Sequence, residues 1–124
     1  LIVAAAGNGD PMSGLGLNID LHKTFPASLT NTSLLVVASA DGQNGLAPYS
    51  NYGKESVDVV GPGGVPPRHL LVSATTQNAH GSAFEALFGT SMAAPVVSGI
   101  AAQVWSLVPQ LSAAQLKEIL KGAG

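Results

Sequence analysis

A long charge-free stretch constrains the fold of this chain more than any other feature. No Asp, Glu, Lys or Arg occurs between residues 86 and 116, and residues 91–107 within it predict a helix that is apolar nearly all round. Such a helix needs packing partners on every side. The stretch opens with Gly-Thr-Ser-Met-Ala-Ala-Pro at residues 89–95. Ser91 therefore either caps a core helix or is a nucleophile held at the start of one.

Apolar runs elsewhere predict strands. They occupy residues 1–6, 34–38, 57–60 and 70–73. Because the runs are continuous rather than alternating, we expect strands covered on both faces, as in a parallel sheet. The four strands scarcely cover the apolar helix. We therefore expect an α/β fold in which these 124 residues are part of a larger domain.

A second, amphipathic helix is predicted over residues 113–121. Ser112 is its expected N-cap, Gln115 the capping-box partner and Gly122 the stop. Its apolar face comprises Leu116, Ile119 and Leu120, and the residues expected to face water are Lys117, Glu118 and Lys121.

Composition excludes several classes of function. The net charge is −2 with scattered basic residues, so neither nucleic acid nor an anionic membrane is an expected partner. Cysteine is absent, which removes disulfides, thiolate metal sites and thiol nucleophiles. Residues 92–108 contain Pro95, Gly99 and Gln103, which disfavours a transmembrane helix, and residues 1–6 are too short for a signal-peptide core.

The glycine-rich loop after the first strand does not fit a phosphate cradle. Both G-x-G-x-x-G frames lack their third glycine, at Met12 and Ile19, and the P-loop frame meets Leu15 instead of Lys. The three histidines lack the spacing of a helical zinc pair. Asn18 and Asp20 could bind calcium, although an Asx turn is the simpler interpretation.

A serine near a helix start usually caps the helix. Two features favour chemistry at Ser91. Free N–H groups and the helix dipole stabilise negative charge that develops there, and Ala93, Ala94 and Gly99 allow close helix packing. The window lacks the second glycine of the G-x-S-x-G nucleophile elbow, so a different serine hydrolase is required.

The motif GTSMAAPVVSG at residues 89–99 resembles the nucleophile signature of subtilisin-like serine proteases. The opening residues 3–8, VAAAGN, resemble the strand that ends at that family's oxyanion-hole asparagine. Further segments match in the family's order, including an aromatic-Pro-Ala element that typically carries a cis proline: residues 25–27, 35–40, 49–53 and 57–63. The resemblance covers nearly the whole chain. It implies a three-layer α/β sandwich with a mostly parallel sheet, of which residues 1–124 are the C-terminal portion.

The resemblance also implies roles for individual residues. Ser91 would be the nucleophile of an endopeptidase, and the Asn8 side chain would join the Ser91 N–H in the oxyanion hole. Ala5, Ala6 and Gly7 would form one wall of the substrate pocket. Thr90 would either support the oxyanion site or cap the helix. No cofactor is required for this chemistry; a structural calcium ion and secretion are expectations from the family alone.

The chain departs from the family pattern at several positions. Val96 stands where His is common, Gly61 where Ala is usual, and Gly9 and Asp10 follow Asn8 at the pocket rim. The family's catalytic Asp and His precede the oxyanion asparagine, so we expect a polypeptide N-terminal to Leu1 to supply them. His80 only faintly echoes the histidine motif and is expected to be an exposed loop residue. Alone, the segment is expected to be inactive on polypeptide substrates; the alternative is a non-catalytic pseudoprotease or docking fragment.

Overall fold

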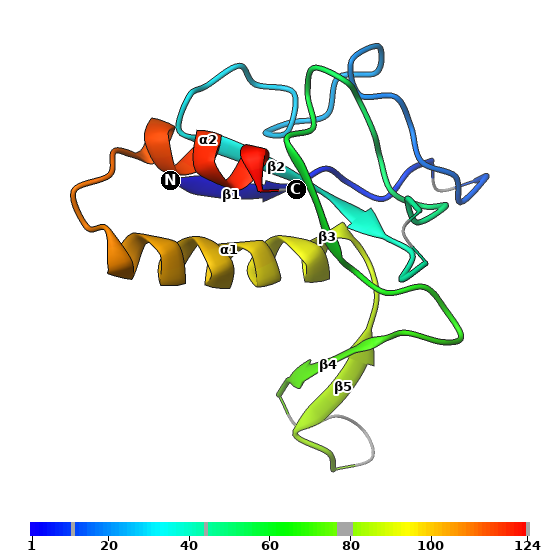
Figure 1. The fold of residues 1–124 in the computed structure, drawn as a ribbon. Coiled ribbons are helices and arrows are strands. Elements are labelled where there is room, and N and C mark those ends of the chain that lie inside the picture. The colour runs from blue at the N-terminus through cyan, green and yellow to red at the C-terminus, as the bar shows by residue number, and fades with distance from the viewer. Residues whose placement is uncertain (11, 44, 77–80, 124) are drawn as a thin grey trace.

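Three parallel strands form the central sheet of the chain. The computed structural model describes residues 1–10, 12–43, 45–76 and 81–123. β1 (Ile2–Ala5), β2 (Leu34–Ala40) and β3 (Val59–Pro62) lie in the order β1-β2-β3 with parallel pairing throughout (Figure 1). The predicted parallel α/β sheet is confirmed.

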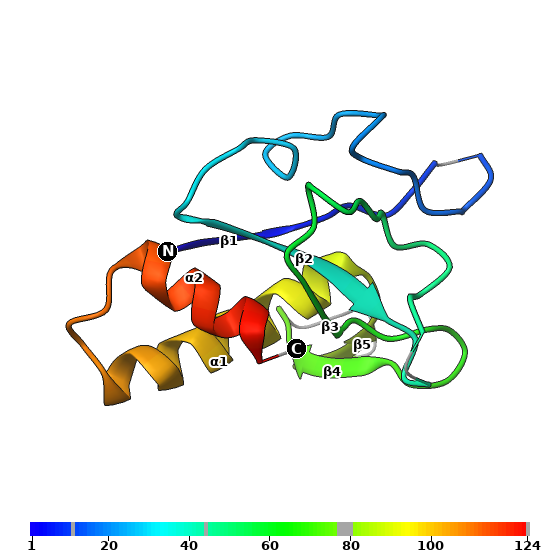
Figure 2. The same cartoon turned by 45° about the horizontal axis from the view of Figure 1, so that its top comes forward.

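Strand β2 is buried on both faces, as its continuous apolar run predicts. Leu35 and Val37 pack into the cluster formed with the two helices. Leu34, Val36 and Ala38 pack on the other face, where the segment between β1 and β2 contributes Ile19 and Ala27. Figure 2 shows this segment arching over the strands on the side away from the helices. A loop, rather than a helix, therefore covers the second face in this chain.

Helix α1 (Thr90–Leu107) packs against all three strands of the sheet. Its buried residues are small or β-branched and follow one side of the helix: Thr90, Ala93, Ala94, Val97 and Ala101. Another side exposes Ile100 and Leu107, which are 47% and 82% accessible. Within the described ranges no helix has the length and hydropathy needed to span a bilayer. The helix is thus apolar all round but covered on one side only.

Helix α2 (Ala113–Gly122) begins at the predicted capping box. The Ser112 side chain accepts a hydrogen bond from Gln115 N, and the Gln115 side chain accepts one from Ser112 N. Leu116 and Leu120 are buried in the same cluster as α1, whereas Ile119 is exposed. The predicted start and apolar face of this helix are confirmed, except for Ile119.

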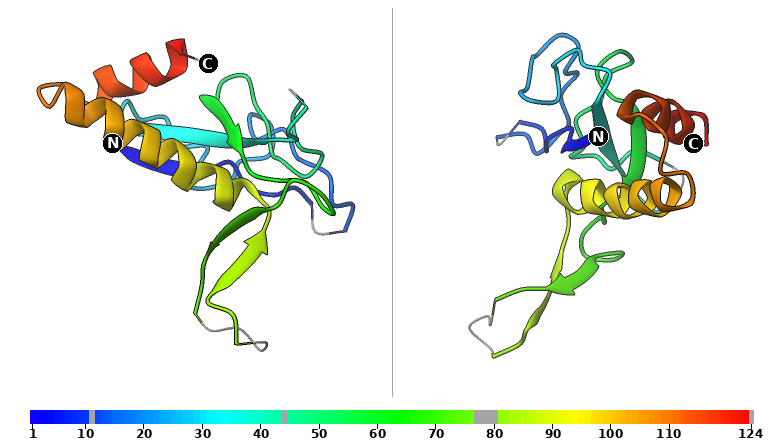
Figure 3. Two further views of the ribbon diagram at one scale, coloured as in Figure 1. Left: turned by 60° about the horizontal axis from the view of Figure 1, so that its bottom comes forward. Right: turned by 90° about the vertical axis from the view of Figure 1, so that its left-hand side faces the viewer.

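An antiparallel hairpin projects from the sheet (Figures 1 and 3). β4 (Leu71–Ala74) pairs with β5 (Phe84–Leu87), with Leu71 opposite Leu87. The expectation that residues 70–73 would join a parallel sheet is wrong. Val72 and Phe84 remain exposed, so the apolar character of this run does not reflect burial in the chain.

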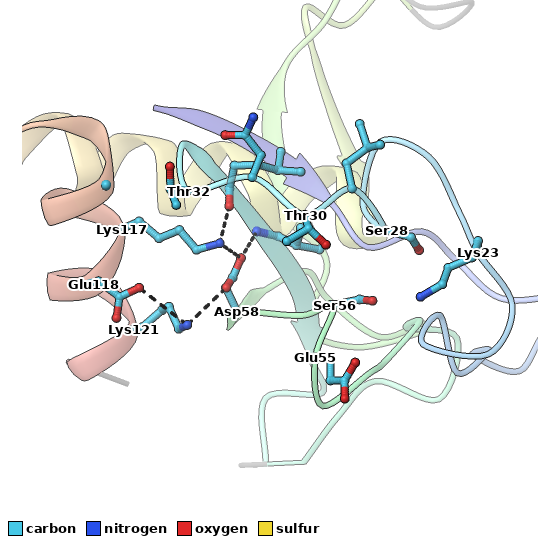
Figure 4. Close-up of a pocket in the computed structure, with 15 residues that line it drawn as sticks. Lys23, Ser28, Thr30, Thr32, Glu55, Ser56, Asp58, Lys117, Glu118 and Lys121 are labelled. Carbon is cyan, nitrogen blue, oxygen red and sulfur yellow. Dashed lines mark hydrogen bonds and ion pairs between the residues drawn. The ribbon is translucent and has the colours of Figure 1, made fainter.

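A buried carboxylate joins the sheet to α2 (Figure 4). Asp58 Oδ2 accepts from Val36 N and from Lys117 Nζ, both at 2.9 Å. Lys117 Nζ also donates to Leu34 O at 2.5 Å, and Lys121 Nζ lies 3.6 Å from Asp58 Oδ1. The expectation that Lys117 faces water is therefore wrong, because its side chain extends from α2 towards the sheet (Figure 4) and pairs with a nearly buried anion.

The long segment between β1 and β2 is organised by turns. Asn18 Oδ1 accepts from Asp20 N at 3.0 Å, which is the Asx turn expected there. The Asp20 carboxylate accepts from Ser56 N at 2.9 Å and from Glu55 N at 3.2 Å. The Phe25–Pro26 peptide bond is cis, as the family resemblance implies. The hydrogen bonds of Asp20 connect this segment to the turn that precedes β3.

We expect the substitution Asp58→Asn to lower the free energy of unfolding by about 3 kcal/mol, because it leaves the largely buried Lys117 ammonium without its anion. Glu118→Gln is the matched control, since the Glu118 side chain is 72% exposed and pairs, among the described residues, with Lys121 alone. That substitution should cost less than about 0.5 kcal/mol. Urea unfolding of the two variants measures both values, and equal effects would contradict the assignment.

Stability should also fall in acid through Asp20. The Ser56 side chain and the backbone N–H groups of Glu55 and Ser56 hold the pKa of Asp20 below its usual value. A lowered folded-state pKa means that the carboxylate stabilises the fold above about pH 4, and that this contribution is lost as pH falls further. Unfolding free energies across this range should depend less on pH in Asp20→Asn than in the unsubstituted chain. Identical acid limbs would refute the prediction.

Candidate active site

Ser91 lies in the first turn of α1, with its side chain exposed. The N-cap residue is Gly89, at φ 138°, and no side chain caps the helix. Among the described residues, Ser91 Oγ has no hydrogen-bond partner. The capping alternative for Ser91 is therefore wrong, and its hydroxyl is left at the amino end of the helix, where backbone N–H groups lack intrahelical acceptors.

Asn8 follows β1 and meets the same helix end. Its Oδ1 atom accepts from Thr90 N at 2.9 Å and from Thr90 Oγ1 at 2.8 Å. Thr90 Oγ1 in turn accepts from Gly7 N at 3.2 Å. Because both bonds go to the oxygen of the Asn8 amide, its Nδ2 group remains available as a donor. The Thr90 hydroxyl serves this contact and does not cap the helix.

Glycine at position 89 is required by this close approach. A φ of 138° is a backbone conformation that L side chains rarely adopt. A Cβ at this position would also lie 3.0 Å from Asn8 Nδ2. Gly89 N donates to Gly63 O at 2.8 Å, just beyond the end of β3. The helix start is thus tied to the carboxyl end of the sheet, where Asn8 also lies, and this is the edge at which α/β folds place their sites.

Ala5 ends β1, and Ala6 and Gly7 lead from the strand to Asn8. Ala6 is fully buried and its N–H donates to Val37 O at 2.9 Å, while Ala5 and Gly7 are partly exposed. Gly7 has a φ of 98°, so the chain turns sharply before Asn8. The structure therefore brings the predicted residues 5–8 together with Thr90, and through Thr90 with Ser91.

Sequence reasoning assigned no role to two groups next to this site. The first is Asn51, which is 3% exposed and bonded to the backbone of residues 6–9. The second is Tyr49, whose hydroxyl donates to Gly64 O at 2.5 Å and lies 2.7 Å from Ser39 Oγ. Its ring packs against Phe88 with centroids 5.4 Å apart. The only signal in the sequence was their place in residues 49–53, a segment noted for its resemblance alone.

A proton acceptor for Ser91 is not among its described neighbours. His22 and His69 are exposed and neither is bonded to Ser91. His80, predicted to be an exposed loop residue, lies outside the described residues. In the part of the chain that the structure describes, no three His, Cys, Asp or Glu side chains converge as a metal site would require. The oxygens of Asn18 and Asp20, considered for calcium, accept backbone hydrogen bonds.

A sequence profile described as the Subtilase family, peptidase S8, matches residues 1–123. The chain belongs to the subtilase family of serine proteases. It is 36% identical over 121 residues to the M-protease of Shouchella clausii, covering 98% of this chain and 26% of that protein. It is 33% identical over 107 residues to subtilisin-like protease 2 of Plasmodium falciparum, covering 86% of this chain and 7% of that protein.

A solved subtilase structure shares the fold. A cold-adapted subtilisin-like serine proteinase superposes with a TM-score of 0.73 at 29% identity, covering 95% of this chain and 36% of that one. The chain therefore spans well under half the length of these subtilases. The fold and family predicted from the sequence are confirmed.

Proposed function

We propose that this chain carries the nucleophile and the side-chain oxyanion donor of a serine endopeptidase. The observation that supports the proposal most directly is the contact between Thr90 and Asn8. It orients the Asn8 amide with its donor free, immediately before Ser91 in the first turn of α1. A free amide donor held against the residue before a serine whose hydroxyl has no partner among the described residues supports acyl transfer at this helix start.

The reaction would proceed through an acyl-enzyme. Ser91 Oγ attacks the peptide carbonyl carbon while a general base takes the hydroxyl proton. The carbonyl oxygen becomes an oxyanion, which accepts hydrogen bonds from Asn8 Nδ2 and Ser91 N–H. The C–N bond then breaks and the amine leaves with the proton from the protonated base. Water, activated by the same base, hydrolyses the ester and restores Ser91.

The base would come from an N-terminal portion of the same domain. In this proposal residues 1–124 are the C-terminal portion, and the other portion supplies the catalytic Asp and His. The exposed Ile100 and Leu107 on α1 support it, because an apolar helix of this kind needs cover on more than one side. By itself the chain would be inactive, since a serine without its base hydrolyses very little.

The substrate would be a polypeptide. Ala5, Ala6 and Gly7 would form one wall of the pocket for the residue before the scissile bond, and Gly9 and Asp10 its rim. Small residues at these positions leave room for a side chain beside β1. The chemistry would need no cofactor, and a structural calcium ion remains an expectation from the family alone.

Covalent labelling tests the proposal. A fluorophosphonate should modify Ser91 when the protein is isolated together with the polypeptide that bears Asp and His, and peptide mass spectrometry locates the adduct. Ser91→Ala should abolish labelling. Ser98→Ala is the matched control on the same helix, since the Ser98 hydroxyl donates to Ala94 O, and it should label normally. An unlabelled Ser91 in the presence of that polypeptide would instead favour the pseudoprotease alternative.

We also expect Thr90→Val to lower kcat by about tenfold with KM little changed. The substitution keeps the shape but removes the hydroxyl that orients Asn8, a loss of about 1–1.5 kcal/mol in the transition state alone. Thr90→Ser retains the hydroxyl and should keep most of the rate. Steady-state hydrolysis of a peptide substrate measures the split, and an effect confined to KM would contradict the role given to Thr90.

A further inference from the structure

The oxyanion loop, defined as residues 6–9, is held by one buried side chain distant in sequence. Asn51 Nδ2 donates to Ala6 O at 2.9 Å, and Asn51 Oδ1 accepts from Gly9 N at 2.8 Å. The backbone N–H of Asn51 donates to Gly7 O at 2.9 Å. Asn51 therefore bonds to each residue of this loop except Asn8 itself.

The same amide oxygen reaches a second segment. Asn51 Oδ1 also accepts from Leu17 N at 2.9 Å, so the loop that carries Asn8 and the returning chain share one acceptor. A Cβ at Gly7 would lie 2.6 Å from Asn51 Nδ2, and one at Gly16 would overlap the carbonyl of Ser50. With backbone packed this closely around it, the Asn51 amide has little freedom to change its orientation.

Both polar atoms of the Asn51 side-chain amide form hydrogen bonds. Asn51 is 3% exposed, and its side chain satisfies one buried carbonyl and two partly buried N–H groups. Leaving such groups unpaired is costly, so the bonded arrangement is strongly favoured over alternatives. Asn8 is exposed and gains its orientation from both sides: Thr90 holds its side chain, and Asn51 holds the backbone around it.

We propose that Asn51 is a positioning residue for catalysis, acting through Asn8. It does not touch the reacting atoms. Three of its hydrogen bonds fix the backbone of residues 6, 7 and 9, and a fourth ties Leu17 N to the same side chain, so that the Asn8 Nδ2 donor is in place before the oxyanion forms. This inference rests on the proposed function, because it assigns to Asn51 the preorganisation of the donor that the function requires.

The isosteric substitution Asn51→Asp isolates this role. The substitution keeps an acceptor oxygen for Gly9 N and Leu17 N. It replaces the Nδ2 donor with a second carboxylate oxygen, which repels the carbonyl oxygen of Ala6. Asp58→Asn is the matched control, because it is the reverse swap at another nearly buried side chain that holds backbone, away from the oxyanion loop. It should lower stability and leave kcat unchanged.

A double-mutant cycle distinguishes positioning from general damage. In the protein assembled with the polypeptide that bears Asp and His, Asn8→Ala should lower kcat by about 10²–10³, the loss known for the oxyanion asparagine of this family. Asn51→Asp alone should lower kcat about tenfold with KM little changed, but by less than about twofold in the Asn8→Ala background. Fully multiplicative effects would overturn the role of Asn51 while leaving that of Asn8 intact.

A readout independent of activity completes the test. In protein labelled with ¹⁵N-asparagine, the side-chain amide resonances of Asn8, assigned with Asn8→Ala, should shift in Asn51→Asp and stay in place in Asp58→Asn. Unchanged Asn8 resonances in Asn51→Asp would overturn the proposal. If the unsubstituted protein, assembled with the polypeptide that bears Asp and His, does not hydrolyse peptide, the proposed function is contradicted. The Asn8 amide resonances would still show whether Asn51 positions Asn8.

Discussion

Burial of β2 on both faces is the constraint on which the rest of the structure depends. Leu35 and Val37 require the helices on one face, and Leu34 and Val36 require the loop with Ile19 on the other. With its faces covered, β2 can bind only at its edges, where β1 and β3 pair in parallel. Parallel pairing sends both neighbouring strands towards the same edge of the sheet. Asn8 after β1 and Gly63 after β3 therefore come to the start of α1 from either side of β2.

The residues of the candidate site at that edge are connected by hydrogen bonds between uncharged groups. Amide, hydroxyl and backbone bonds connect Asn8, Thr90, Gly7 and Asn51, and no charged side chain takes part in them. Neutral hydrogen bonds are directional, and in a partly buried setting they are stronger than in water. They suit the task of holding a donor at a fixed angle. In the proposed reaction they could not accept the serine proton at neutral pH, so a group from elsewhere would have to act as the base.

Local signals in the sequence predicted the local features well. The capping box at Ser112 and Gln115 involves residues three positions apart, and the unbroken apolar run at residues 34–38 reports burial on two faces. The roles proposed for Ser91 and Asn8 come from a resemblance rather than from periodicity. The geometry that links them could not have been read from spacing, since the bonds from Thr90 to Asn8 join residues 82 positions apart.

The features that the sequence predicted wrongly or not at all also depend on contacts between distant residues or on a lack of burial. Lys117 has the pattern of a solvated helix face, yet a carboxylate from the turn before β3 draws its ammonium group inwards. Strand β5 has no alternating or continuous apolar run, because a hairpin exposed on both faces places no demand on its side chains. In the sequence Asn51 resembles any other turn residue, because its four backbone partners all lie more than 30 positions away.

The proposed oxyanion donor and the proposed nucleophile differ in how far contacts within this chain fix their orientation. The proposed oxyanion donor, Asn8, is held on both sides by bonds within the chain, so its orientation would not depend on a polypeptide that brings the base. The Ser91 hydroxyl is unbonded within the described residues and can rotate about its side-chain bond. An incoming histidine would therefore do two things at once: accept the proton and select the rotamer from which Ser91 attacks. Because the donor is already in place, the free energy of that association can be directed almost wholly at the nucleophile.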